Sequence, residues 1–136
     1  MIGEREMTGK DIVGGFFAAF GAGDMDKAMG LLKEDVRWTF HAPEGTIPWA
    51  GTFNGREGVG KFFELFLAAA DPVEMAPAGM WEEDGIVFVQ GSETTRVKST
   101  GKQYTAQWVH MVATADGQVV SLDEHIDSAA VAAAFG

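Results

Sequence analysis

Apolar residues recur at helical spacing in three segments of the first half of the chain. The first segment follows a capping box formed by Thr8 and Asp11, and a shorter second segment follows the N-cap residue Asp24. A capping box at Asn54 predicts the start of a third helix, which ends before Pro72. The apolar faces contain Ile12, Val13, Phe16, Phe17 and Phe20 in the first helix, Met25, Ala28, Met29 and Leu32 in the second, and Val59, Phe62, Phe63, Phe66 and Leu67 in the third.

The remaining segments alternate between apolar and polar residues, as β-strands do. Residues 36–42 predict a first strand, and residues 43–53, which prolines and glycines interrupt, predict a loop. After Pro72 the pattern predicts an antiparallel meander of four strands, over residues 73–83, 86–97, 103–114 and 119–126. A short helix capped by Asp127 or Ser128 is expected to close the chain.

This order of elements predicts an α+β domain. Three N-terminal helices would pack on one face of a curved, mostly antiparallel sheet, and a short C-terminal helix would follow. The sequence contains no internal repeat and no linker-like segment. Residues 1–136 are therefore expected to form a single domain.

The composition narrows the classes of function. The chain contains 10 basic and 20 acidic residues, so its net charge of -10 disfavours nucleic acid as a partner. The lack of cysteine excludes disulfides, thiolate metal sites and thiol nucleophiles. The first residues lack the apolar core of a signal peptide, and no apolar run is long enough to span a bilayer. We expect a cytoplasmic protein that does not bind membranes.

The turn signal at Asp116 and Gly117 gives a register for the last two strands. If these residues form a two-residue turn, Val109 lies opposite Glu124. The face that contains Glu124 would also carry Gln107, Val109, Met111, Leu122 and Ile126, and we expect the helices to cover it because it is the more apolar face. A carboxylate buried there costs free energy, so the pKa of Glu124 should rise. Glu124 is the leading candidate acid or base, and the alternative is a structural carboxylate paired with a lysine or arginine.

The opposite face of the same two strands carries Trp108, His110 and His125. The register places Trp108 opposite His125, and His110 opposite Asp123. We expect these side chains to form an exposed aromatic patch through which the chain makes a symmetric homodimer. A metal site or a catalytic His–Asp pair is the alternative interpretation.

Glu93 is a second candidate acid or base. The alternation of Val87, Val89 and Val97 places Glu93 and Thr95 on the interior face, provided that a three-residue turn at 99–101 follows. Glu93 would then lie opposite Gln107. A two-residue turn would instead direct Glu93 outward.

The segment VRWTFHAPEGTIPWAGTFNG, residues 36–55, combines strand, loop and helix signals. Trp38 and Phe40 share one strand face and are expected to line a pocket. His41 points away from that face unless the strand ends before it, and it is a candidate acid or base at the rim of the pocket. Trp49 lies in the loop, where it is either ordinary packing or a lid over a ligand.

The segments FGAGDMDKAMGLLKEDVRW, PWAGTFNGREGVGKFF and WVHMVATADGQVVSLDEHID, in this order, resemble the SnoaL-like branch of the NTF2-like superfamily. The resemblance extends from about Thr8 to Phe135. It implies a cone of helices wrapped on a curved sheet, a deep apolar pocket, and often a dimer through the sheet. Relatives include ketosteroid isomerases, limonene epoxide hydrolases and polyketide cyclases.

The resemblance also limits the mechanism. Phe16, Phe40 and Val109 fall where steroid isomerases carry their catalytic groups, so that mechanism is not expected. Glu124 falls on one catalytic aspartate of the epoxide hydrolases, but Thr95 and Glu93 leave the rest of that triad incomplete. A lone pocket carboxylate, which the resemblance to polyketide cyclases implies, is still available in Glu124.

We therefore expect a cofactor-independent isomerase, cyclase, lyase or hydrolase that acts on a small apolar oxygenated molecule, or else a binding module that holds such a molecule without changing it. No metal is expected. Glu124 would move a proton while Glu93, Thr95 and Gln107 orient the oxygens of the substrate. The expected pocket residues are Phe16, Trp38, Phe40, Trp49, Phe63, Thr95, Gln107, Val109, Met111, Leu122 and Ile126.

Overall fold

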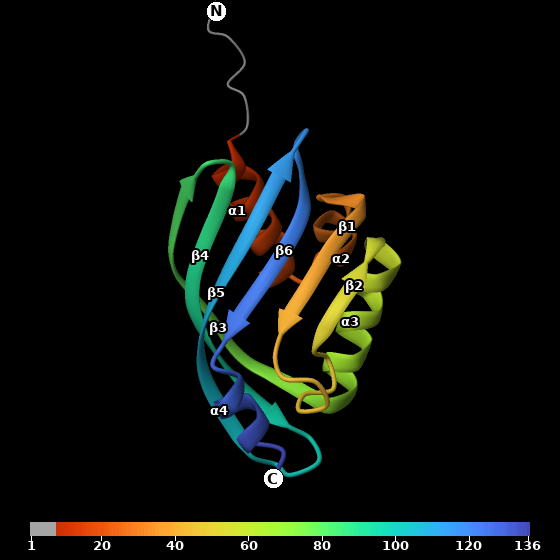
Figure 1. Ribbon diagram of the computed structural model, residues 1–136, viewed down its shortest axis with the longest axis vertical. Helices are drawn as coiled ribbons and strands as arrows, with labels where there is room; N and C mark the ends of the chain where they lie inside the picture. The colour runs from red at the N-terminus through yellow and green to blue at the C-terminus, as the bar shows by residue number, and fades with distance from the viewer. Residues whose placement is uncertain (1–7) are drawn as a thin grey trace, which may run out of the picture.

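The computed structural model describes residues 8–136, and these residues form four helices and six strands (Figure 1). The expectation about a signal peptide rests on residues 1–13, of which residues 1–7 lie outside the described residues. The elements in chain order are α1 (Gly9–Gly21), α2 (Met25–Gly30), β1 (Leu32–His41), β2 (Gly51–Asn54), α3 (Gly55–Ala69), β3 (Ala70–Glu83), β4 (Ile86–Val97), β5 (Gln103–Ala115), β6 (Gln118–Ile126) and α4 (Ser128–Ala133).

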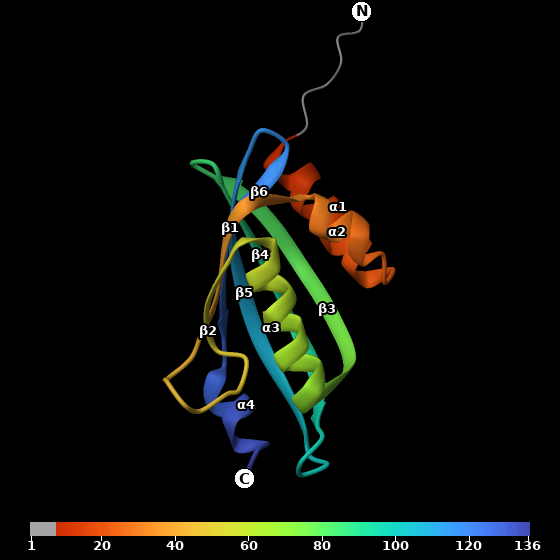
Figure 2. The same ribbon diagram turned by 90° about the vertical axis from the view of Figure 1, so that its right-hand side faces the viewer.

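The six strands form one curved sheet in the order β2-β1-β6-β5-β4-β3. All neighbouring strands are antiparallel except β1 and β6, which are parallel. The helices α1, α2 and α3 lie on one face of this sheet, and the other face is open (Figures 1 and 2). Two helices precede the first strand, whereas α3 follows β2. No helix of the described residues is long and apolar enough to cross a membrane.

The helix caps follow the sequence with one exception. Thr8 and Asp11 form the expected capping box, and the side chains of Asp24 and Asp127 cap α2 and α4. The prediction of a capping box at Asn54 was wrong, because the side chain of Asn54 makes no cap hydrogen bond. Asn54 is the last residue of β2, where it pairs with Arg37, and α3 begins only after it.

The loop predicted over residues 43–53 contains the start of an unexpected strand. Gly51 to Asn54 pair with β1 in antiparallel register and form one edge of the sheet. A strand of four residues carries too few alternating positions to be recognised by its periodicity. At the opposite edge, the register of β3 shifts near Pro72 and Pro77, and an edge strand tolerates proline because only one side of it pairs.

The pairing of β5 differs from the prediction at both of its ends. The Asp116-Gly117 turn pairs Ala115 with Gln118 as expected, but a bulge then skips Val120, so that Ala113 pairs with Ser121 and His110 with Glu124. At the other end the turn contains four residues, 98–101, and Glu93 pairs with Ala106 rather than with Gln107. Each of these two registers differs from the predicted one by a single residue. Because side chains alternate along a strand, the face of β5 that points to the interior is the one predicted to point outward.

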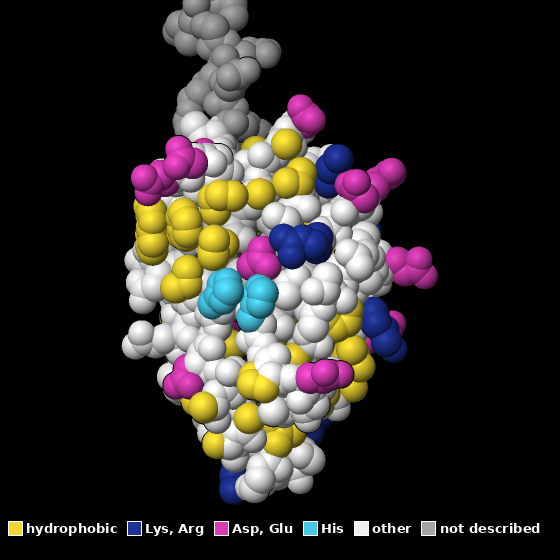
Figure 3. Space-filling model, in the orientation of Figure 1, with side chains coloured by type: hydrophobic (Ala, Val, Ile, Leu, Met, Phe, Trp, Pro, Cys, Tyr) yellow, Lys and Arg dark blue, Asp and Glu magenta, His cyan; other side chains and the backbone are white. Residues whose placement is uncertain are grey.

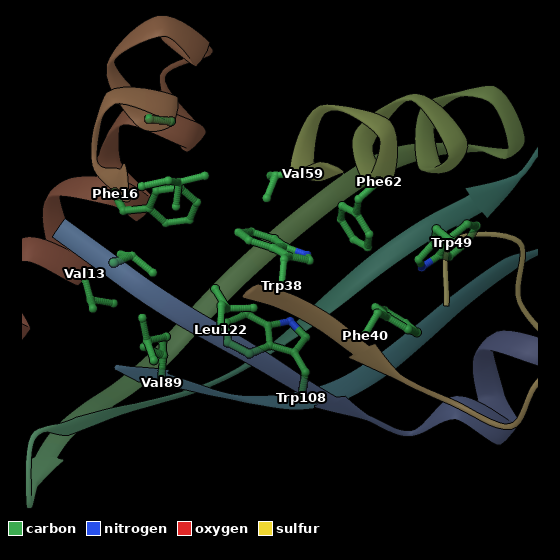
Figure 4. Close-up of a cluster of buried hydrophobic side chains, with 14 of the residues drawn as sticks. Val13, Phe16, Trp38, Phe40, Trp49, Val59, Phe62, Val89, Trp108 and Leu122 are labelled. Atoms are coloured by element: carbon green, nitrogen blue, oxygen red, sulfur yellow. The ribbon is translucent and has the colours of Figure 1, made fainter. Parts of the chain in front are cut away.

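The interior side of β5 therefore carries Tyr104, Ala106, Trp108, His110 and Val112, all of which are buried. Figure 4 shows Trp108 on the same side of the sheet as Trp38, Phe40 and Leu122, pointing towards the helices. Gly91, which pairs with Trp108, makes room for the indole, because a Cβ atom at this position would lie 2.7 Å from Cζ2 of Trp108. The aromatic core between helices and sheet is thus completed by a strand face that was predicted to be exposed.

Candidate functional site

A cavity of about 310 Å³ lies between the helices and the interior face of the sheet. Its walls come from α1, α3, β1 and the first part of β3, and nine of its lining residues are phenylalanine or tryptophan. Phe16 lies 5.9 Å from Trp38, and Phe20 lies 5.1 Å from Phe63, measured between ring centroids. The size and the apolar walls suit a small organic molecule.

Three of the cavity's four titratable lining residues come from adjacent sheet strands, namely Glu93 from β4, His110 from β5 and Glu124 from β6. The fourth, Glu74 of β3, is exposed. His110 and Glu124 are only 3% and 6% exposed. Because these three strands are neighbours in the sheet, their polar groups share one region of an otherwise aromatic cavity.

His110 and Glu124 form a close pair. Nε2 of His110 lies 3.4 Å from Oε1 of Glu124, a distance that allows an ion pair when the imidazole is protonated. Within the described residues neither ring nitrogen of His110 has a hydrogen-bond partner. The imidazole instead packs on aromatic rings, 4.4 Å from Trp108 and 5.5 Å from Phe17 between centroids. A buried histidine in this state has hydrogen-bonding capacity that a ligand can satisfy.

The carboxyl group of Glu93 has an altered acidity. Its pKa is raised to about 7, mainly by burial and then by the negative charge of Glu124, while the hydrogen bond from Thr95 opposes the rise. Thr95 is fully buried and donates a hydrogen bond of 3.1 Å to Oε2 of Glu93. Burial, followed by the charge of Glu93, also raises the pKa of Tyr104, whose hydroxyl group is buried beside this site. Glu93 can therefore gain or lose a proton near neutral pH.

Many of the expected site residues lie at the cavity. Glu93 and Glu124 both line it, together with five of the expected pocket residues: Phe16, Trp38, Phe40, Trp49 and Phe63. Thr95 does not line the cavity, but it donates a hydrogen bond to the carboxylate of Glu93, which does. Leu122 and Ile126 point to the interior and belong to the core under the cavity rather than to its lining. Their roles in binding or catalysis stay predictions.

The expected positions of Gln107, Val109 and Met111 were wrong. The shift in register turns these three side chains to the open face of the sheet, away from the cavity. The same shift moves Trp108 and His110 from the predicted exposed patch to the interior. Of the three residues assigned to that patch, only His125 lies on the open face, where its ring stacks on His41 at a centroid distance of 4.3 Å.

His41 does not lie at the rim of the cavity. It is the last residue of β1, it is 44% exposed, and its Nε2 lies 2.8 Å from Oδ1 of Asp123 on the open face. The strand continues through His41, so its side chain points away from Phe40, as strand alternation requires. Arg37 also contacts Asp123, at 3.3 Å.

Trp49 does not form a lid at the surface. It is only 1% exposed and packs against Phe40, Phe66 and Phe135, so it closes the end of the cavity near α4. The exposed apolar lining residues lie elsewhere, and we call them the cavity mouth: Met25, Leu67 and Met75. Ligand entry is therefore expected between α2, the end of α3 and the start of β3.

Sequence reasoning missed His110 as a member of the site, although two signals were present. Gln103, Thr105 and Gln107 share one face of β5, and three polar residues in alternation indicate the solvent side. Gly91 on the interior face of β4 left room for a large neighbour, which is Trp108. Both signals place His110 inside.

Among residues 8–136 no cluster of histidine, aspartate and glutamate side chains is arranged to hold a metal ion.

Comparison with known proteins assigns the family. Residues 13–122 match the SnoaL-like domain, and the chain belongs to this family. An NTF2-like protein from Burkholderia xenovorans LB400 is 30% identical over 92% of this chain and 93% of its own, with a TM-score of 0.80. A comparison with curated proteins gives no match.

Two more distant structures share the fold. A Bacillus subtilis protein proposed to be an isomerase is 19% identical over 93% of this chain and 91% of its own, with a TM-score of 0.76. A Mesorhizobium loti protein proposed to be a SnoaL-like polyketide cyclase is 15% identical over 88% of this chain and 99% of its own, with a TM-score of 0.71. The SnoaL-like, NTF2-like fold expected from the sequence is thus confirmed.

Proposed function

We propose that the protein is a cofactor-independent enzyme that acts on a small apolar oxygenated molecule by acid and base catalysis, as an isomerase, cyclase, lyase or hydrolase. The observation that carries this proposal is the pair His110–Glu124, buried 3.4 Å apart in an aromatic cavity. Buried acid and base groups in a cavity are typical of catalytic sites.

The chemistry follows from the groups present. The carboxylate of Glu124 takes a proton from a carbon next to a carbonyl group, and the electron pair of that C–H bond moves to the carbonyl oxygen to give an enolate. Glu124 then passes this proton to Nε2 of His110, and the imidazolium delivers it to another atom of the enolate, which leaves both side chains as they began. Glu93 orients the substrate from the neighbouring strand, and Thr95 fixes the position of Glu93.

The family supports the reaction class without fixing the reaction. Proteins of the same fold include one proposed to be an isomerase and one proposed to be a polyketide cyclase. Both reactions involve proton transfer. The alternative is a binding module that uses the same cavity without catalysis.

Exchange of carbon-bound hydrogen tests the proposal without knowledge of the substrate. The protein is incubated in deuterium oxide with a panel of cyclic and aromatic ketones, and deuterium uptake is measured by mass spectrometry. We expect uptake in at least one compound and a loss of roughly 10²- to 10⁴-fold in Glu124→Gln, the usual effect of removing an acid or base. Binding of panel compounds without any exchange would favour the binding module.

We also propose that the open face of the sheet forms a homodimer. Trp81 of β3 is 46% exposed and stacks on Phe88 of β4 at a centroid distance of 5.6 Å. Phe88 pairs across the sheet with Met111, which pairs with Asp123. Figure 3 shows a hydrophobic patch on this face beside the two exposed histidines, with acidic groups around its rim. Such a face suits contact with a second copy.

A further inference from the structure

The cavity contains carboxylates but no basic side chain other than an imidazole. Glu74, Glu93 and Glu124 line it, and none of its lining residues is lysine or arginine. The arginines of the described residues have other partners. Arg37 contacts Asp123 on the open face, Arg56 donates a hydrogen bond to the backbone oxygen of Leu32, and Arg96 contacts Asp71 at 2.8 Å. The described residues therefore give the cavity a negative charge that no basic side chain in its lining neutralises.

Glu93 has the least compensated charge of the three. Glu124 has His110 beside it, and Glu74 is exposed to water. Glu93 receives one hydrogen bond from Thr95, and its acidity is shifted by burial and by the charge of Glu124. A buried carboxylate in this state is stabilised by any positive charge that enters the cavity.

The walls of the cavity favour the same kind of ligand. The π-faces of phenylalanine and tryptophan attract cations, and aromatic enclosures are a recurring site for ammonium groups. Phe16, Phe20, Trp38 and Phe63 form a connected set of rings, with centroid distances of 5.1 to 6.4 Å between neighbours. A neutral apolar ligand would contact these rings equally well but would leave Glu93 without a positively charged partner.

We propose that the ligand of this cavity is an organic cation, whose ammonium group lies between the carboxylate of Glu93 and the aromatic wall. This inference deepens the proposed function, on which it rests, because it adds a positive charge to the oxygenated substrate. Glu74 beside the cavity mouth and the net charge of -10 attract cations towards the opening. Anionic ligands face repulsion from the same groups.

A pair of probes that differ in charge but not in shape tests the inference. Phenyltrimethylammonium and tert-butylbenzene are isosteric, and the quaternary ammonium group neither donates a hydrogen bond nor loses a proton. Binding is measured by titration calorimetry and by the fluorescence of the lining residues Trp38 and Trp49, at a pH of about 8 where most Glu93 is ionised. We expect the cation to bind at least tenfold more tightly than its neutral isostere.

Two variants with the same change in net charge test whether the tighter binding of the cation depends on Glu93. Glu93→Gln should abolish the advantage of the cation, whereas Glu64→Gln, at an exposed position of α3, should preserve it. Circular dichroism checks that both variants fold. Equal binding of the two probes by the natural protein, or an advantage that survives Glu93→Gln, would overturn the inference.

The binding experiment with the two probes can fail independently of the exchange experiment that tests the proposed function. Exchange that depends on Glu124 together with equal binding of the two probes would overturn the cationic ligand and leave the proton transfer standing. A cation advantage that depends on Glu93, without exchange in ketones that carry an ammonium group, would support the cation site and contradict the enzyme.

Discussion

His110 places Nε2 3.4 Å from Oε1 of Glu124, yet neither ring nitrogen makes a hydrogen bond within the described residues. The two residues pair across β5 and β6 because a bulge skips Val120. Without this bulge His110 would face the open side of the sheet, and Glu124 would be buried beside valine. The acid and base groups therefore meet through a local irregularity of the backbone.

Removal of the charge of Glu124 should increase the acidity of Glu93. The negative charge of Glu124 is the second cause of the raised pKa of Glu93, after burial. In Glu124→Gln we expect the pKa of Glu93 to fall below about 7 while remaining above its ordinary value of 4.5. Titration of carboxyl groups by NMR measures both values, and Glu64→Gln serves as the control. An unchanged pKa would mean that the two carboxyl groups do not interact.

Glu93 should make the stability of the fold depend on pH. The folded protein binds the proton of Glu93 more tightly than the unfolded chain, with a pKa of about 7 against 4.5. Stability is therefore lost as the pH rises through this window and levels off above it, by an amount on the order of 3 kcal/mol. Glu93→Gln lacks this titration, so unfolding of the two proteins in urea from pH of about 4 to about 8 isolates the effect. A constant difference across the window would contradict it.

Gly91→Ala should destabilise the protein because of Trp108. The added Cβ atom would lie 2.7 Å from Cζ2 of the indole and 2.7 Å from the carbonyl oxygen of Ala76. We expect the free energy of unfolding to fall by about 1–3 kcal/mol. The matched control is Gly79→Ala, whose Cβ atom meets nothing within 4 Å. Similar denaturation midpoints for both variants would show that the indole has room to move.

Trp49→Ala should also destabilise the fold, since the side chain is buried among Phe40, Phe66 and Phe135. The expected loss is about 3–5 kcal/mol, as for other buried tryptophans. Trp81→Ala, at the exposed tryptophan of β3, is the control and should cost much less. A small loss at Trp49 with weakened ligand binding would restore the interpretation of this residue as a lid.

The proposed dimer predicts that a charge at Phe88 prevents association. Phe88→Glu places a carboxylate next to the exposed ring of Trp81, on which Phe88 stacks. Sedimentation velocity at tens of micromolar should show a dimer for the natural protein and a monomer for this variant. Val73→Glu, at an exposed position of β3, should remain a dimer. A natural protein that sediments as a monomer would refute the proposal.

The sequence predicts the elements of this fold well because their ends carry strong local signals. The capping box at Thr8 and the N-cap residue Asp24 mark two helix starts, and the glycine turns at Asp84 and Asp116 mark two hairpins. The interior position of Glu124 was predicted from the more apolar of the two faces expected for the last two strands, and Glu124 is indeed buried. These features depend on residues near one another in the chain.

The pairing of strands was harder to predict, because it depends on single residues at turns and bulges. The bulge at Val120 carries no glycine or proline to reveal it, and the turn at 98–101 is one residue longer than expected. Both errors fell on β5, so the prediction placed His110 on the open face and placed Val109 and Met111 in the interior, the reverse of what the structure shows. The burial of Glu124 was therefore predictable, whereas that of His110 beside it was not.

The bulge at Val120 has a consequence for the comparison of relatives. A relative that lacks it would present the other set of β5 side chains to its cavity, even where the two sequences align without a gap. A residue in the column of His110 could then be catalytic in one protein and exposed in another. Roles on this strand should be transferred only after superposition of the strands in space, and an apparent loss of a pocket acid can reflect a change of backbone register.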